Sequence, residues 1–448
     1  MKAMKRCLSV FALVLLFALL GGMLVSCDTD SRTVLPFTGS KGSDSDTTTH
    51  VTDVTIDNGS IIVTYSNGSR VNIGSSVTNV NKNVIDNVTI AGSAGGTTEF
   101  AASRALQSTV EVVCKFKKNV DSWYYSQEKS YAAAGSGVIY RFDEATGDAY
   151  IITNQHVVYD SDSNTSDHVS DDISVYLPGS TSPIPVTYVG GSADYDIAVL
   201  RVKETGRAAL KASDALAATP ADSSALYVGS TALVVGNPEG SGISATAGII
   251  SVDSEYIQMT AIDNQRGVRE FRVIRVDAAV NSGNSGGGLY NEKGELIGIV
   301  NAKSVSDSGN SGGNIENIGY AIPSNVAIAV AENIVDNGGT LHRALLNIKV
   351  QSENAHIVYD EKTFRTSIVE TVRVSEVSAG VGKNMGILVG DVLQSVKVGG
   401  RDAVQVTRSF HMIDEMLNAR VGDTVTVTVL RNGQTETLTG TVGADWFR

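Results

Sequence analysis

Cysteine, proline and aromatic residues are scarce in this chain of 448 residues. Of its three cysteines, Cys7 lies inside an N-terminal apolar segment and Cys27 lies at its end, which leaves only Cys114 in the remainder. One remaining thiol excludes an intrachain disulfide framework, and its apolar neighbours favour a buried, inert cysteine. The seven prolines beside 45 glycines favour a β-rich fold with many tight turns over a helical bundle.

The chain also lacks an excess of basic residues. Its formal net charge is -13, which argues against nucleic acid as a partner and against polybasic binding to anionic lipid. The first residues are an exception, because Lys2, Lys5 and Arg6 precede an apolar run at 8–20 that is shorter than a membrane span. This pattern predicts an export signal over residues 1–26.

The end of this signal, Leu24-Val25-Ser26-Cys27, resembles a bacterial lipobox. That resemblance implies cleavage before Cys27, lipidation of its thiol, and a protein held by acyl chains on the outer face of the cytoplasmic membrane. The alternative is an ordinary signal peptide with a chance cysteine.

Composition divides the rest of the chain into four parts. Residues 27–50 are rich in Asp, Ser, Thr and Gly and are expected to form a disordered tether. Residues 51–100 alternate apolar and polar side chains around Asn58-Gly59 and Asn67-Gly68, which predicts a small β module and a linker. Residues 101–340 and 341–448 are expected to form a larger and a smaller domain.

Short strands separated by Gly, Asp and Asn turns dominate the larger domain, which is typical of an antiparallel barrel or sandwich. The clearest helix is expected at 324–335, and the smaller domain has a helical pattern at 410–418. Expected strands are 137–140, 149–153, 173–176, 197–202, 232–235, 272–276, 296–300, 348–352 and 425–430.

Three polar positions in the larger domain have the residue types of nucleophilic catalysis. His156 follows the expected strand 149–153, where a rigid backbone can direct it into a cleft. Asp196 opens the apolar strand 197–202, and a carboxylate there needs hydrogen-bond donors such as a histidine N–H. Ser285 lies in a glycine-rich turn. Each position alone has a structural interpretation, so the prediction depends on the three together.

The turn around Ser285 suits an oxyanion hole. Glycines 283, 286 and 287 permit a tight turn, and the N–H groups of Gly283 and Ser285, together with Asn284, are the candidate donors. The same five letters recur around Ser311. Ser285 is flanked by apolar strands, whereas Ser311 lies in a polar stretch that a loop explains, so Ser285 is the predicted nucleophile.

The chain order His156, Asp196, Ser285 is that of chymotrypsin-like double barrels, and the segments around these residues resemble the HtrA/Deg family of bacterial envelope proteases. The resemblance extends from about residue 103 to the end of the chain. It is carried by segments in family order: 135–139, 153–156, 196–200, 235–238 with 247–251, 277–281, and 319–325.

This resemblance implies two six-stranded β-barrels with the catalytic triad between them, followed by a PDZ domain. It implies a cofactor-free and metal-free serine endopeptidase that cleaves unfolded or misfolded envelope proteins, commonly as a homotrimer. Residues 118–131 match a family loop that is often long and regulatory. By matching position, the primary specificity pocket would be lined by Val280, Ile299, Val300, Asn301 and Ala302.

In the PDZ-like domain, C-terminal peptides would bind at the loop that contains Leu345, Leu346, Asn347 and Ile348. The family usually has a glycine where this chain has Asn347, so the alternative is a PDZ fold kept for assembly. Two alternatives to an enzyme also stay open. The chain could be a non-catalytic chaperone or peptide sensor on a protease scaffold, or an adhesin built on residues 51–91.

Overall fold

The computed structural model describes residues 51–57, 60–65, 70–75, 97–122, 125–260, 268–301 and 318–447. The predicted signal peptide and tether, with Cys27, lie outside these residues, and so do Ala302 and Ser311. No helix in the described ranges is long and apolar enough to cross a membrane. The chain divides into two compact units, residues 1–89 and 90–448.

The first unit contains the predicted β module. Strands β1 (Val51–Asp57), β2 (Ser60–Tyr65) and β3 (Arg70–Ser75) form a three-stranded antiparallel sheet. The two Asn-Gly pairs of the sequence lie outside the described residues.

The second unit begins with α2 (Thr98–Ser108), whose N-cap Thr97 accepts a hydrogen bond from the N–H of Phe100 at 3.2 Å. A closed barrel of antiparallel strands follows, in the order β4-β5-β6-β9-β8-β7. It also carries α3 (Gln155–Val158) and α4 (Glu204–Ala212). The strands are β4 (Thr109–Ser122), β5 (Tyr125–Phe142), β6 (Ala149–Thr153), β7 (Asp172–Tyr176), β8 (Ile184–Ser192) and β9 (Ile197–Val202).

Strand β9 shows why the strands of this barrel have continuous apolar runs in the sequence. Ala198 and Leu200 face the core inside the barrel, while Ile197 and Val199 belong to a second core on its outer side, with Val330 of α5 (Ser324–Asp336). A strand covered on both faces has no solvent-facing positions to alternate with. Cys114 is fully buried in the inner core, as predicted, and burial, together with the nearby Asp172 carboxylate, raises the pKa of its thiol to about 12.

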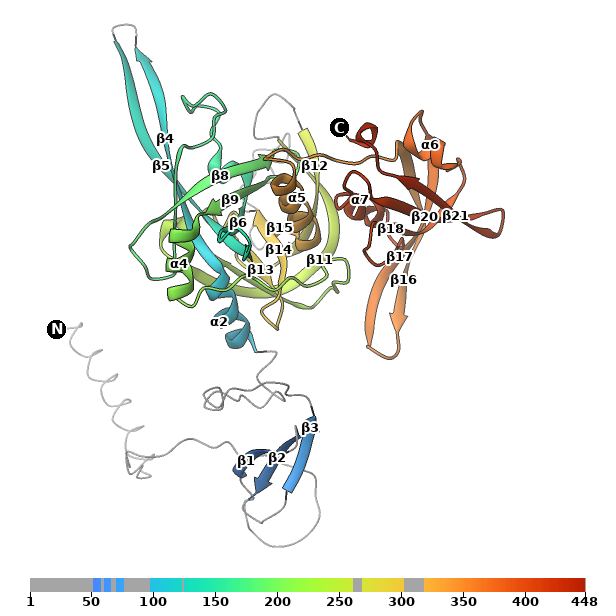
Figure 1. Cartoon of the computed structure of the whole chain (residues 1–448), viewed down its shortest axis with the longest axis horizontal. Coiled ribbons are helices and arrows are strands. Elements are labelled where there is room, and N and C mark those ends of the chain that lie inside the picture. The colour runs from blue at the N-terminus through green and yellow to red at the C-terminus, as the bar shows by residue number, and fades with distance from the viewer. Residues whose placement is uncertain are drawn as a thin grey trace, which may run out of the picture. The chain divides into compact units, whose positions relative to one another are not determined.

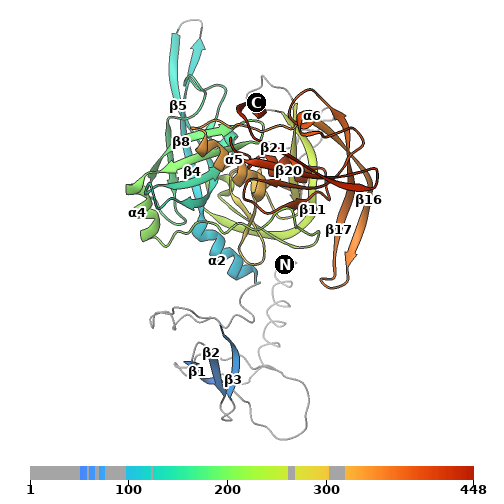
Figure 2. The ribbon, with the colours of Figure 1, turned by 45° about the vertical axis from the view of Figure 1, so that its right-hand side comes forward.

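Strands β4 and β5 extend past the barrel as one long hairpin (Figure 1 and Figure 2). Their pairing continues without a shift from Thr109↔Val138 to Ser122↔Tyr125. Residues 118–131, expected from the family resemblance to be a loop, therefore mostly continue a β-ladder. Apolar periodicity did not predict this extension, because polar side chains such as Lys117 and Lys129 interrupt the pattern.

A second closed barrel, in the order β10-β11-β12-β15-β14-β13, completes the larger domain. A 3₁₀ turn at Pro238–Gly240 follows its first strand. The strands are β10 (Thr231–Gly236), β11 (Ser244–Thr260), β12 (Val268–Val276), β13 (Gly288–Tyr290), β14 (Leu296–Asn301) and β15 (Gly319–Pro323).

The C-terminal domain is a six-stranded sheet in the order β16-β17-β18-β20-β21, with β19 beside β18. It has its own apolar core, which includes Val374, Val427 and Trp446. The strands are β16 (Ile348–Asp360), β17 (Arg365–Val377), β18 (Val392–Val398), β19 (Val404–Gln405), β20 (Thr424–Arg431) and β21 (Gln434–Thr441); the helices are α6 (Val381–Met385) and α7 (Phe410–Met416), with a 3₁₀ turn at Ala444–Trp446.

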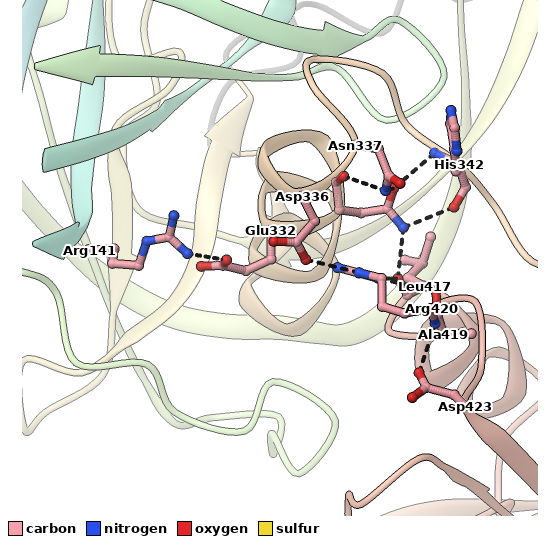
Figure 3. Close-up of polar contacts among 10 residues, drawn as sticks. Arg141, Glu332, Asp336, Asn337, His342, Leu417, Ala419, Arg420 and Asp423 are labelled. Carbon is pink, nitrogen blue, oxygen red and sulfur yellow. Dashed lines mark hydrogen bonds and ion pairs between the residues drawn. The ribbon is translucent and has the colours of Figure 1, made fainter. Parts of the chain in front are cut away.

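Helix α5 joins the larger domain to the C-terminal domain, and polar contacts lie on both sides of it (Figure 3). Glu332 pairs with Arg141 of β5, and Asp336 accepts from Arg420, which follows α7, at 2.9 Å. The prediction of a mainly β chain, with a double barrel followed by an α+β domain, is confirmed.

Candidate active site

Three side chains from distant parts of the larger domain meet at one place. His156 Nδ1 lies 2.7 Å from Asp196 Oδ2, and His156 Nε2 lies 2.8 Å from Ser285 Oγ. Asp196 is 40 residues from His156 in sequence and Ser285 is 129 residues away. The two imidazole nitrogens therefore face one acidic and one hydroxyl partner, the arrangement that makes a serine hydroxyl nucleophilic.

Each of these residues occupies a strand end or a turn. His156 is in the short helix α3, three residues beyond the last residue of β6. Asp196 directly precedes β9 with φ of +50°, a left-handed conformation that aspartate tolerates better than most residues. Ser285 lies in the turn before β13. Rigid neighbouring strands fix all three backbones.

The Asp196 carboxylate is 1% exposed, and its neighbours supply several hydrogen bonds. Oδ1 accepts from the His156 backbone N–H at 3.0 Å, and Oδ2 accepts from the Asn301 side-chain amide at 2.9 Å. The Asn154 amide donates to the Asp196 carbonyl oxygen at 2.8 Å. The His156 N–H and the Asn301 amide offset the cost of burying the carboxylate and fix its direction, while the Asn154 amide holds the Asp196 backbone.

Sequence reasoning missed the contacts of both amides. Asn154 received no role, although it directly precedes α3, and Asn301 was expected in the specificity pocket. The position of Asn154, two residues before His156, was the available signal. Asn301 is 105 residues from Asp196, so only the barrel pairing brings it near the acid.

The Ser285 turn requires glycine at two positions. Gly283 has φ of +93° and Gly286 has φ of +83°. A Cβ atom at Gly283 would lie 2.2 Å from the Asn237 carbonyl oxygen, and one at Gly286 would lie 2.1 Å from the Ser136 carbonyl oxygen. Any side chain would therefore displace the turn.

The peptide groups around Gly283 have a defined direction. The Ser282 carbonyl accepts from the Glu239 N–H at 2.8 Å. Because the C=O and N–H of one peptide unit point in opposite directions, the Gly283 N–H points away from Glu239. The Asn284 N–H instead donates within the turn to the Asn281 carbonyl at 3.0 Å. Of the three predicted oxyanion residues, Asn284 therefore uses its backbone donor to hold the turn.

The candidate pocket residues have different surroundings. Val280 is half-buried beside the core of the second barrel, whereas Ile299 and Val300 are fully buried in apolar cores. The Val300 backbone pairs with the nucleophile turn, because its carbonyl accepts from Gly286 and its N–H donates to Gly287. The Val300 backbone therefore supports the nucleophile turn.

The C-terminal domain has a cavity of about 410 Å³ between the start of β16 and helix α7. All four predicted peptide-loop residues line it, with the apolar side chains of Met412 and Met416 opposite. Asn347 has φ of +57°, the left-handed region in which glycine and asparagine are the most tolerated residues. Asparagine at the family's glycine position is thus compatible with the loop.

No group of three or more His, Cys, Asp and Glu residues in the described ranges has the arrangement of a metal site. The arrangement of His156, Asp196 and Ser285 is suited to acyl transfer by a serine hydroxyl.

Similarity to known proteins agrees with this chemistry. The trypsin-like peptidase domain family matches residues 135–299, and the PDZ domain family matches residues 335–442. A serine protease Do-like HtrA of Lactococcus lactis subsp. cremoris is 33% identical over 313 residues, which cover 68% of this chain and 70% of the relative. The HtrA of Bacillus subtilis is 32% identical over 316 residues, or 69% of this chain and 63% of the relative.

A third relative, the periplasmic pH-dependent serine endoprotease DegQ of Escherichia coli, is 32% identical over 305 residues, or 68% of this chain and 58% of the relative. The chain therefore belongs to the HtrA/Deg family, and it is a serine endopeptidase with a trypsin-like peptidase domain followed by a PDZ domain.

Proposed function

We propose that this serine protease cleaves peptide bonds with Ser285 as nucleophile, His156 as general base and acid, and Asp196 as the residue that orients the imidazole. The observation that carries this proposal is the continuous hydrogen-bonded line from Asp196 Oδ2 through both His156 nitrogens to Ser285 Oγ, with separations of 2.7 and 2.8 Å. It gives each residue the neighbour that its role requires.

In this mechanism the Ser285 hydroxyl attacks the substrate carbonyl while His156 Nε2 takes the hydroxyl proton. Asp196 stabilises the imidazolium that forms and keeps Nδ1 protonated. The N–H groups of Gly283 and Ser285 donate to the oxyanion of the tetrahedral intermediate. His156 then returns the proton to the leaving amine, and water hydrolyses the acyl-enzyme by the same steps in reverse.

The proposed substrates are unfolded or misfolded proteins outside the cytoplasm. One relative is named a periplasmic pH-dependent endoprotease, and the N-terminal lysines, apolar run and Cys27 of this chain suit export and lipid anchoring. Membership of the family supports a homo-oligomer, with a trimer as the size to test.

The PDZ domain is proposed to bind C-terminal peptides and thereby regulate cleavage. Peptide addition beside β16 would place an apolar C-terminal side chain against Met412 and Met416. Arg343 also lines the cavity, and its guanidinium lies 5.6 Å from the ring centroid of Tyr195, the residue before Asp196. This contact gives a physical link between peptide occupancy and the catalytic acid.

The test uses the full chain in detergent with an unfolded, carboxymethylated reporter protein, with and without a peptide that ends in a hydrophobic residue. We expect the parent to fragment the reporter and the peptide to accelerate this cleavage. Ser285→Ala should lower the rate by on the order of 10⁶-fold while still binding the reporter. Equal behaviour of parent and variant would instead favour the non-catalytic chaperone.

A further inference from the structure

Ser136, in β5 of the first barrel, is a fully buried residue next to the nucleophile turn. Its hydroxyl donates to the Gly283 carbonyl at 2.7 Å and accepts from the Asn237 N–H at 2.8 Å. Gly283 and Asn237 both belong to the second barrel domain. One hydroxyl group on the first barrel therefore joins two backbone segments of the second.

The backbone of Ser136 reinforces this contact. Its N–H donates to the Ser285 carbonyl at 2.8 Å, and its own carbonyl accepts from the Thr153 hydroxyl at 2.7 Å. Thr153 is the last residue of β6, the strand that leads to His156. Ser136 is thus bonded both to the strand that carries the base and to the turn that carries the nucleophile.

The two hydroxyl contacts act on the direction of the Gly283 N–H. The Gly283 carbonyl belongs to the peptide that follows this N–H, so fixing the carbonyl limits rotation about Gly283. The Asn237 N–H begins the turn that places the Glu239 N–H on the Ser282 carbonyl at 2.8 Å. The Ser136 hydroxyl therefore holds the peptides on both sides of the Gly283 α-carbon.

Glycine needs such restraint more than other residues, because it occupies positive and negative φ about equally well. A rotation of the Ser282–Gly283 peptide plane would turn the Gly283 N–H away from the oxyanion. Loss of a single oxyanion donor lowers turnover by about 10²- to 10³-fold in serine proteases.

We propose that Ser136 is a positioning residue for the oxyanion hole, which its hydroxyl holds in the donor-inward state by bridging Gly283 and Asn237. This inference rests on the proposed function of Ser285. The Ser136 hydroxyl does not touch substrate, so its effect is on transition-state stabilisation and not on substrate binding.

The test compares the full-length parent in detergent with Ser136→Ala and with Ser324→Ala. Ser324 is also fully buried, and its hydroxyl donates to the Ala221 carbonyl at 3.0 Å at the start of α5, so it is a matched control for loss of a buried hydroxyl. Active sites are counted by fluorophosphonate titration carried to completion. A fluorogenic peptide then gives kcat per titrated site and KM, and a peptide boronic acid reports tetrahedral-adduct binding.

We expect Ser136→Ala to lower kcat per titrated site by about 10- to 100-fold, with KM within about twofold of the parent. The inhibition constant of the boronic acid should rise by a similar factor, because its adduct uses the same hole. In a plot of kcat/KM against pH, the fall in kcat/KM at low pH should occur at the same pH as in the parent, because His156 and Asp196 keep their contacts. Ser324→Ala should match the parent in every constant.

Three results for Ser136→Ala would overturn the inference. The first is an unchanged kcat per titrated site with fewer titrated sites, the second is a rise in KM alone, and the third is a shift of the low-pH fall in kcat/KM. The first would give Ser136 a purely structural role, and the others would assign it to substrate binding or to the triad. A parent that neither titrates nor cleaves would instead remove the proposed function, and this inference with it.

Discussion

Asp196 illustrates how single residues determine this site. Its buried carboxylate can hold the imidazole only if other donors fix its own orientation, and the Asn301 amide is one of them at 2.9 Å. A hydrogen bond to a charged group contributes about 1.5–3 kcal/mol. In the proposed mechanism part of that energy is available to the transition state, because the imidazolium forms only there.

Replacement of Asn301 by alanine is therefore expected to lower kcat/KM by about tenfold. The measurement is steady-state cleavage of a fluorogenic peptide by the full chain. Asn325→Ala is the matched control, since the Asn325 amide also donates to an aspartate, Asp222, at 2.7 Å outside the site. Equal losses in the two variants would contradict a specific role for Asn301.

Asn347 makes a different prediction at the same scale. Its left-handed backbone permits glycine and strains a β-branched residue. Asn347→Gly should keep peptide affinity within about threefold, whereas Asn347→Val should weaken it by about tenfold or more, because the strain costs about 1–2 kcal/mol. Fluorescence anisotropy with a labelled C-terminal peptide gives both values.

Asn354 provides the control for Asn347, since it has φ of +52° in the exposed part of β16, away from the cavity. Asn354→Val introduces the same backbone strain without touching the peptide loop. Equal weakening by the two valine variants would mean that the effect acts through the stability of the domain.

The types and order of the three catalytic candidates could be predicted because each adjoins a strongly apolar strand. The side chains that hydrogen-bond to the catalytic candidates and to the nucleophile turn could not be predicted. Asn301 and Ser136 act through residues more than a hundred positions away, and that proximity depends on barrel register, which local sequence does not encode. The same limit explains why Asn301 was expected only in the pocket.

At the scale of elements, apolar periodicity predicted strands well where both faces are covered. The expected bounds 149–153 and 197–202 are those of β6 and β9. Helix α4 was missed because only Arg207 and Leu210 of its residues are buried, so its apolar face is too narrow to detect. The hairpin extensions of β4–β5 and β16–β17 were missed because backbone pairing continues there through polar residues.

Helix α7 contains a histidine whose burial affects stability. His411 is 8% exposed, and its Nδ1 accepts from the Thr407 N–H at 3.2 Å, which requires an unprotonated nitrogen. Burial, with the positive charges of Arg272 and Arg408, lowers its pKa from 6.5 to about 4. The folded chain keeps His411 neutral at a pH where the unfolded chain protonates it.

His411 should therefore contribute about 3 kcal/mol that is fully present above pH 6.5 and lost as pH falls to about 4. In urea unfolding at several pH values, His411→Asn should lose less stability than the parent over this window. Burial raises the pKa of Asp414 to about 6 against the attraction of Arg272, and this acts in the opposite direction. The difference between variant and parent isolates the histidine.

The exposed His356 of β16 supplies the control variant His356→Asn, which should follow the parent at every pH. Parallel curves for the parent and His411→Asn would contradict the assignment of this pH dependence to His411.

At the scale of the molecule, polar contacts join the protease and PDZ domains. Arg272 of β12 pairs with Asp414 of α7, and Arg408 donates to Asp253 of β11 at 3.1 Å. Asn333 of α5 is fully buried, and its amide donates to the carbonyl oxygens of His342 at 2.9 Å and Leu417 at 3.2 Å. These contacts hold the linker and the end of α7 against the protease domain.

Asn333→Ala is expected to destabilise the contact between the two domains by about 2 kcal/mol, because the buried Leu417 carbonyl and the His342 carbonyl lose their donor. Calorimetry of the full chain should show a lower unfolding temperature for the PDZ domain. The control is Asn337→Ala, which removes an amide that donates at the end of α5 to the Asn333 carbonyl at 2.8 Å and to the Asn333 side-chain oxygen at 3.1 Å. A smaller change in Asn333→Ala than in Asn337→Ala would contradict the role of this contact.

Identification of the nucleophile tests the central claim most directly, since Ser285 and Ser311 lie in identical five-residue segments. The measurement is reaction of the active full chain with a fluorophosphonate, followed by peptide mapping, with His156→Ala as a variant that lacks the base. The account predicts one phosphonyl group, on Ser285, and little or none in His156→Ala. A label on Ser311, or cleavage that persists after Ser285 is fully phosphonylated, would contradict it.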